Sequence, residues 1–88
     1  MQKSILTKYW LSFNEKTSYP LGVGVTAYSL EDAEALVAKR LFSNGYVPAF
    51  NQKMINSLDD LEQNHVLPNI GHITFRGIWF PEMEPENR

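Results

Sequence analysis

Residues 22–33 read GVGVTAYSLEDA, and this stretch decides the fold because it passes from a strand almost directly into a helix. The alternation of apolar with small or polar residues over 23–27 predicts a strand with one apolar face. Ser29 and Asp32 have the spacing of a helix-capping box, so we expect a helix to begin at Leu30. The two glycines then lie inside the strand, too far from the helix N-terminus to form a phosphate-binding turn.

The expected helix covers residues 30–42. Acidic residues occupy its first turn and basic residues come late, which matches the helix dipole. Asn44-Gly45 is a typical helix stop. The apolar side chains recur every three or four residues and should form one buried face: Leu30, Ala33, Leu36, Val37 and Leu41.

A second strand is expected ahead of this stretch. Residues 8–14 read KYWLSFN and alternate in hydropathy, and the polar loop 15–20 connects them to the strand at 21–28. The two strands should form a hairpin in which Trp10 covers the groove left by the two glycines. As an edge strand, the glycine-bearing strand could also pair with a copy of itself in a homodimer.

The pattern after the helix is less regular. Residues 46–71 hold an extended piece at 47–50 and one or two helical turns over 57–62, within a long connection. A third strand is expected over 72–80, where Gly77 permits a bulge.

These elements predict an α+β domain. Its sheet is expected to be antiparallel and three-stranded, in the order 2-1-3, with the one main helix on one face and a β-β-α-(short helix)-β succession. Residues 1–81 should form this single domain, and residues 82–88 an acidic C-terminal tail. The expected core consists of Tyr9, Leu11, Phe13, Val23, Val25, Leu36, Val37, Leu41, Ile73 and Phe75.

Composition narrows the class of function. The chain has 88 residues, no cysteine and a net charge of −2. The absence of cysteine excludes disulfides, thiolate catalysis and cysteine-ligated zinc. Without a signal-peptide pattern or a long apolar run, the sequence predicts a soluble cytoplasmic protein. Residues 59–88 carry six acidic side chains against two arginines, so direct binding of nucleic acid is not expected.

Histidine and carboxylate side chains gather in one segment. A proline and a glycine between His65 and His72 exclude a shared helix, so we expect neither a metal site nor a cofactor. Asp59, Asp60 and Glu62 precede His65 and are the one candidate cluster for acid–base chemistry. A charge run on a short turn is more often a solvated face, and we assign no catalytic residue.

The sheet face directed away from the helix is the second candidate site. Trp10, Tyr28, Arg76 and Ile78 should share this face. An exposed group of aromatic residues with arginine is typical of an interface core. The alternative is that residues 46–71 fold over the face and bury it, and the sequence leaves both open.

The whole chain resembles the small immunity proteins that are encoded beside bacterial polymorphic toxins, including those of contact-dependent growth inhibition. The residues that carry the resemblance are the strand KYWLSF at 8–13, the capped helix after Tyr28-Ser29, and GHITFRGIWF at 71–80. The resemblance implies a non-catalytic protein that binds a cognate toxin domain, frequently a nuclease, and blocks its action.

An inhibitor of a basic nuclease surface should present carboxylates to it. We therefore expect Asp59, Asp60 and Glu62 to make charged contacts with the partner. Trp10 or Trp79 should act as the apolar anchor, together with Arg76 on the sheet face. A small regulatory or phage-type adaptor protein is the alternative, and a small hydrolase or nuclease built on His65 and Asp60 is the third.

Overall fold

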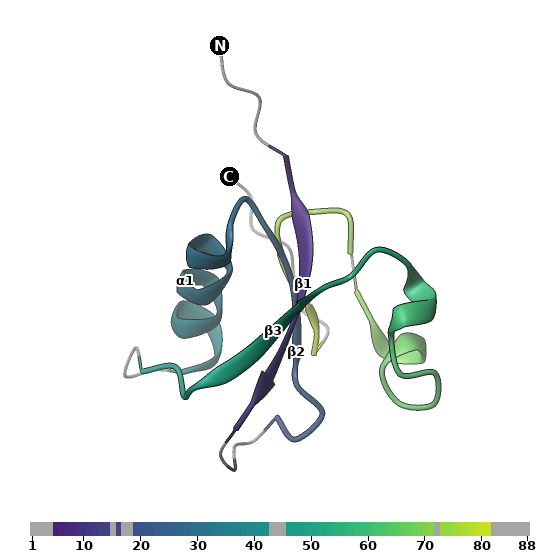
Figure 1. Cartoon of the computed structure of the whole chain (residues 1–88), viewed down its shortest axis with the longest axis horizontal. Helices are drawn as coiled ribbons and strands as arrows, with labels where there is room; N and C mark the ends of the chain where they lie inside the picture. Colours follow the sequence, from purple (N-terminus) through teal and green to yellow (C-terminus); the bar gives the residue numbers. More distant parts are fainter. Residues whose placement is uncertain (1–4, 15, 17–18, 43–45, 72, 82–88) are drawn as a thin grey trace.

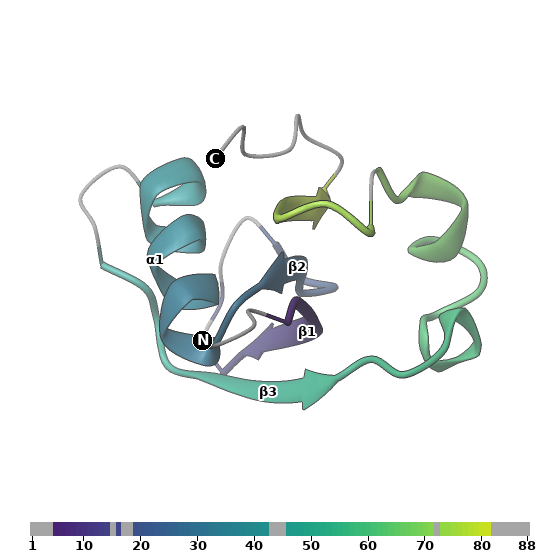
Figure 2. The ribbon, with the colours of Figure 1, turned by 90° about the horizontal axis from the view of Figure 1, so that it is seen from above.

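The computed structural model describes residues 5–14, 16, 19–42, 46–71 and 73–81. It is an α+β fold with a four-stranded antiparallel sheet in the order β3-β1-β2-β4. Helix α1 lies on one side of this sheet, and the segment that follows β3 lies on the other (Figures 1 and 2). The elements are β1 Thr7–Phe13, β2 Val23–Ala27, α1 Leu30–Leu41, β3 Phe50–Met54, the 3-10 turns η1 Leu58–Asp60 and η2 Leu67–Asn69, and β4 Gly77–Phe80.

The hairpin expected from the sequence is present. β1 and β2 are antiparallel, with Tyr9 opposite Val25 and Leu11 opposite Val23. These four side chains are buried on the side of the sheet that faces α1. Burying apolar surface on one face of a period-two pattern fixes this register, because a shift by one residue would expose the whole set.

The helix also forms as expected from its cap. The Ser29 hydroxyl accepts a hydrogen bond from the Asp32 N–H at 3.1 Å, and α1 begins at Leu30. Ala33, Leu36 and Val37 are its buried residues. The Asn44-Gly45 stop lies outside the described residues.

The prediction of a three-stranded sheet was wrong because β3 carries no alternating pattern. Its sequence FNQKM is mostly polar, and four of its five residues are exposed. The strand pairs with β1 along its whole length, from Tyr9–Met54 to Phe13–Phe50. β1 is thus an inner strand, as expected, but one of its two neighbours is β3.

The predicted order 2-1-3 was also wrong, because the C-terminal strand pairs with β2. This strand covers only Gly77–Phe80 of the expected 72–80. β2 therefore lies inside the sheet, and the predicted pairing of β2 with a second copy is excluded. The predicted bulge at Gly77 is displaced, since the register shifts between the Val25–Ile78 and Gly24–Phe80 pairs and leaves Trp79 as the additional residue.

The side of the sheet opposite α1 has its own small core. Ile55, Leu61, Val66 and Trp79 are buried there, and Ile73 packs against them. Two expectations for the α1 side were therefore wrong: Ile73 belongs to this second cluster, and Phe75 is 55 % exposed. The other predicted core residues are buried on the α1 side or packed against that core: Tyr9, Leu11, Phe13, Val23, Val25, Leu36, Val37 and Leu41.

Ile78 of the last strand points to the opposite side of the sheet from the one expected. Ile78 packs in the core on the α1 side, whereas Trp79 lies on the other side. Gly24 explains this arrangement: a Cβ atom at residue 24 would come within 2.4 Å of the Trp79 ring. Trp79 covers Gly24, so the expectation that Trp10 covers both glycines is confirmed only at Gly22, whose φ is 108° and against which the Trp10 ring lies.

Candidate functional site

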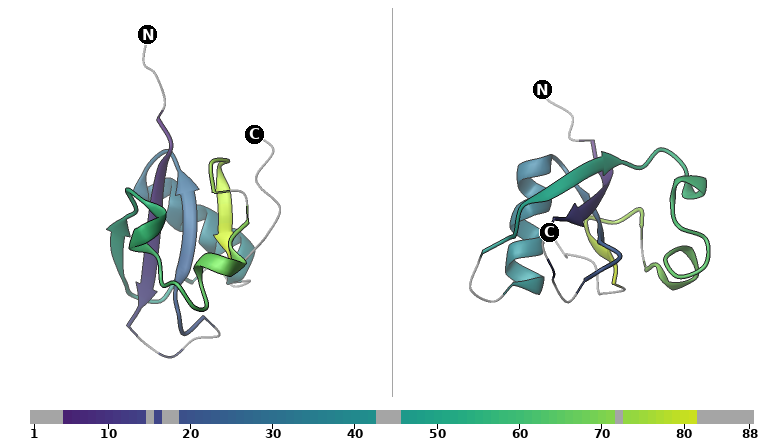
Figure 3. Two further views of the ribbon diagram at one scale, coloured as in Figure 1. Left: turned by 90° about the vertical axis from the view of Figure 1, so that its right-hand side faces the viewer. Right: turned by 60° about the horizontal axis from the view of Figure 1, so that its bottom comes forward.

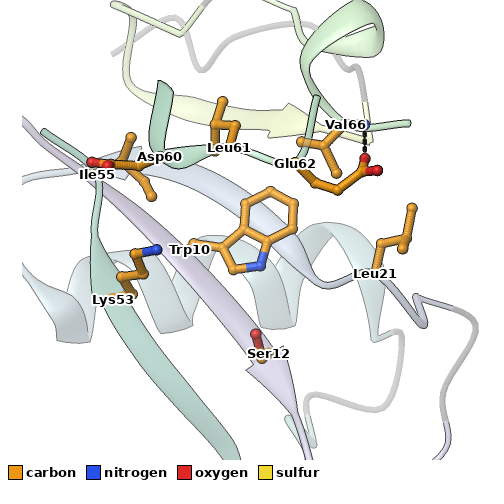
Figure 4. A pocket seen from close by; sticks show the side chains of 9 residues that line it. All are labelled: Trp10, Ser12, Leu21, Lys53, Ile55, Asp60, Leu61, Glu62 and Val66. Atoms are coloured by element: carbon orange, nitrogen blue, oxygen red, sulfur yellow. Dashed lines mark hydrogen bonds between the residues drawn. The ribbon is translucent and has the colours of Figure 1, made fainter. Parts of the chain in front are cut away.

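A pocket of about 320 Å³ lies on the side of the sheet opposite α1. Trp10 of β1 and Lys53 of β3, which are direct partners across the two strands, form its base. The chain that follows β3 forms the facing wall, where Asp60 and Glu62 lie (Figure 4). Three of the six residues expected to bind a partner, Trp10, Asp60 and Glu62, are therefore brought to one site.

Trp10 is partly exposed and rests on other aromatic rings. Its ring centroid is 6.0 Å from that of Trp79 and 5.5 Å from that of Phe80. Figure 4 shows the indole between the strands and the facing wall. This support leaves the Trp10 side chain few alternative positions, so its exposed surface is preformed for contact.

Trp79 supports the site from beneath and does not line the pocket. Its side chain is 0 % exposed, and its Nε1 donates to the Thr26 hydroxyl at 3.0 Å. The same hydroxyl donates to the Ile73 carbonyl at 2.6 Å. Trp79 is thus a core residue in this structure, and between the two predicted anchors only Trp10 reaches the surface.

Asp60 fixes the turn that forms one side of the wall. Its Oδ2 accepts hydrogen bonds from the Asn56 N–H at 3.1 Å and the Ser57 N–H at 3.3 Å. The Ser57 hydroxyl in turn accepts from the Asp59 N–H at 3.1 Å. A side-chain oxygen that satisfies free backbone donors holds a short turn in one conformation.

Glu62 does the same for the next turn. Its Oε1 accepts from the His65 N–H at 2.6 Å and the Val66 N–H at 3.0 Å. Its Oε2 lies 3.1 Å from His65 Nδ1. The hydrogen bond from the His65 backbone is the main reason why the pKa of Glu62 is lowered, because it stabilises the ionised carboxylate.

Asp59 is exposed and differs from these two carboxylates. It does not line the pocket, and its carboxylate has no hydrogen bond or ion pair with the part of the chain that the structure describes. It is adjacent to Asp60 in η1, so its charge adds to the acidic wall. Asp60 and Glu62 are held in place by hydrogen bonds from backbone N–H groups. Sequence patterns did not predict these hydrogen bonds.

Arg76 lies at a different place from the one expected. Its guanidinium binds the Asp32 carboxylate with two hydrogen bonds, of 2.9 and 2.6 Å, at the start of α1. The same group lies 5.5 Å from the centre of the Tyr28 ring. Arg76 does not line the pocket, and the predicted common face of Trp10, Tyr28, Arg76 and Ile78 does not form.

The pocket also contains residues that sequence patterns did not indicate. Lys53 and Ser12 are the main examples, and both lie on the strands at its base. Lys53 belongs to a strand without alternation, so its position opposite Trp10 follows only from the β1–β3 register. Lys53 could have been placed in the pocket only if the β1–β3 register had been known.

The histidines were the other candidates from the sequence, for metal binding or acid–base chemistry. Among the described residues, no group of three or more His, Cys, Asp or Glu side chains could hold a metal ion. His65 is exposed beside Glu62 and does not line the pocket, and His72 lies outside the described residues. No helix in the described ranges is long and apolar enough to cross a membrane.

Comparisons with known proteins identify no relative of this chain. No protein-family model matches the chain, and neither the curated proteins nor the solved structures that were compared with it give a significant match.

Proposed function

We propose that this chain is a non-catalytic binding protein that neutralises a cognate bacterial toxin domain, in the cytoplasm, by covering part of its functional surface. The observation that carries the proposal is the pocket in which the partly exposed Trp10 faces Asp60 and Glu62. Interfaces concentrate their binding energy in aromatic residues of this kind, surrounded by polar groups.

The rigidity of the acidic wall favours tight binding. Asp60 and Glu62 are already held by backbone N–H groups of their own turns. A partner that binds to these carboxylates does not have to order them first, which lowers the entropic cost of association. A carboxylate oxygen can accept two hydrogen bonds, and those of Asp60 and Glu62 to the backbone go to only one oxygen of each group, so both groups can still receive donors from a partner.

The chemistry of the pocket favours a basic partner group. A lysine or arginine side chain could lie over the Trp10 ring and reach the carboxylates on the facing wall. Nuclease domains carry such groups where they bind phosphates, and a nuclease is therefore the preferred toxin class. Lys53 places a positive charge beside Trp10 at the base of the pocket and repels a basic group there, so the carboxylates of the facing wall have to supply the attraction.

Two other classes of function have less support. A small regulatory or phage-type adaptor would use the same pocket with a different partner, and only the identity of that partner separates it from an inhibitor. A hydrolase or nuclease built on His65 and Asp60 would need both groups at one reacting centre. His65 is instead exposed and held by Glu62 outside the pocket.

Co-expression with the protein encoded directly upstream tests the proposal. The wild-type chain should restore growth of cells that produce the upstream protein, and Trp10→Ala should lose this protection. Tyr28→Ala is the matched control, because Tyr28 is an exposed aromatic residue that does not line the pocket. An upstream protein that is not toxic, or protection that survives Trp10→Ala in full, would contradict the proposal.

A further inference from the structure

We propose that two copies of this chain associate through the outer edge of β3, as an antiparallel pair centred on Gln52, to form one continuous sheet. The inference is independent of the proposed function. The sheet order leaves β3 at one edge, with β1 as its neighbour. Figures 2 and 3 show no described segment alongside the outer side of β3.

The direction of the backbone groups in β3 follows from two hydrogen bonds. The Asn14 N–H donates to the Ala49 carbonyl, and the Ile55 N–H donates to the Lys8 carbonyl. Residues that point toward a neighbouring strand alternate with residues that point away. Residues 49, 51, 53 and 55 therefore face β1, and the N–H and C=O groups of Phe50, Gln52 and Met54 face outward.

The opposite edge of the sheet is partly closed. The Gly71 N–H donates to the Trp79 carbonyl at 2.8 Å, so a backbone group on the outer side of β4 is already paired. The outward backbone groups of β3 have no hydrogen bond within the described chain. An unpaired edge of five residues without proline or a bulge is the arrangement that pairs with another strand.

The side chains of β3 fit a second copy in one register. With Gln52 opposite Gln52 of the second copy, Phe50 comes opposite Met54 and Lys53 comes opposite Asn51. Both Phe50–Met54 pairs place a thioether beside an aromatic ring, and they cover Met54, which is 54 % exposed. No like charges are directly opposed, because the one charged residue of the strand meets an amide.

Single-cysteine variants test this register directly, because the chain has no cysteine of its own. Residues directly opposite in a hydrogen-bonded pair have Cα atoms about 5.5 Å apart, within the reach of a disulfide. The diagonal distance between two copies of residue 53 is about 7–8 Å, which is beyond that reach. Under mild oxidation, Gln52→Cys should form a cross-linked dimer about tenfold faster than the control Lys53→Cys, which also lies at an exposed position of β3. Equal rates for the two variants would overturn the proposed register.

Sedimentation of the wild-type chain and of Gln52→Pro tests the association itself. Proline at residue 52 removes an N–H that faces outward and leaves the bonds with β1 intact, so the monomer should keep its fold and its circular dichroism. It should weaken dimerisation about a hundredfold, whereas Gln52→Ala should leave the dimer in place. A wild-type chain that remains monomeric at the highest soluble concentration would overturn the proposal, as would a Gln52→Pro chain that dimerises like the wild type.

Discussion

Arg76 and Asp32 form a two-pronged ion pair that joins the segment before β4 to the first turn of α1. Nε of Arg76 lies 2.9 Å from Oδ2 of Asp32, and Nη2 lies 2.6 Å from Oδ1. Asp32 Oδ2 also accepts from the Tyr28 N–H at 3.0 Å. The Asp32 carboxylate therefore connects the residue after β2, the start of α1 and the segment before β4.

Loss of this pair should destabilise the fold. Both side chains are mostly buried, with 23 % and 18 % exposure, so Arg76→Ala leaves a carboxylate that water only partly solvates. We expect a loss of about 1–3 kcal/mol in the free energy of unfolding, measured with urea. Glu31→Gln is the control, because Glu31 is the exposed carboxylate next to Asp32 and its change should cost less than about 0.5 kcal/mol. Equal stability of Arg76→Ala and Glu31→Gln would show that the pair contributes nothing.

The same pair predicts how stability depends on pH. The hydrogen bond from Arg76 is the main cause that lowers the pKa of Asp32 below its ordinary value of 3.8. A carboxyl group with a lowered pKa in the folded state stabilises the fold above its unfolded pKa and loses this contribution as pH falls through the folded value. The stability difference between wild type and Asp32→Asn should therefore be constant from pH 7 to about 4 and then shrink. A difference that persists unchanged at pH 2 would contradict this assignment.

The contact between Gly24 and Trp79 predicts a coupled pair of substitutions. A methyl group at residue 24 would collide with the Trp79 ring, so Gly24→Ala should cost about 1–3 kcal/mol of stability. In a Trp79→Leu background the same change should cost clearly less, because the smaller side chain leaves room for the methyl group. A double-mutant cycle from urea unfolding measures this coupling. Additive costs would mean that the strain at residue 24 has another source.

The turn held by Asp60 gives a test of the acidic wall. Asp60→Asn keeps an oxygen that can accept from the backbone and removes the charge, whereas Asp60→Ala removes both. Hydrogen exchange of the Asn56 and Ser57 amides should stay close to wild type in Asp60→Asn and become markedly faster in Asp60→Ala. If both variants exchange like the wild type, Asp60 does not organise this turn.

The local elements of the fold could be predicted from the sequence. The alternation in β1 and β2 and the Ser29–Asp32 cap are local signals, and each element formed where its signal lies. β3 has no such signal, since an exposed edge strand can be polar on both faces. Its omission led to the wrong neighbour for β1 and to the wrong sheet order.

The candidate site could be predicted only in part for the same reason. The alternation in β1 puts Trp10 on the face away from the helix, and the run of carboxylates singles out Asp60 and Glu62; these three line the pocket. Arg76 was misplaced because its partner Asp32 is 44 residues away, and no local pattern encodes such a pairing. The prediction for Trp79 was wrong because its ring packs on Gly24 of β2. β2 was not expected to pair with the strand that carries Trp79.

The central claim is that the Trp10 pocket and its acidic wall bind a toxin domain. Calorimetric titration of the upstream protein with the wild-type chain, at low and high salt, measures this binding directly. Trp10→Ala should weaken the affinity by about 2 kcal/mol or more, and Tyr28→Ala should leave it unchanged. Asp59→Asn/Asp60→Asn should reduce the salt dependence of binding, because it removes two charges from the wall and keeps the Asp60 turn. Affinities and salt dependences that are the same for all of these variants as for the wild type would contradict the claim.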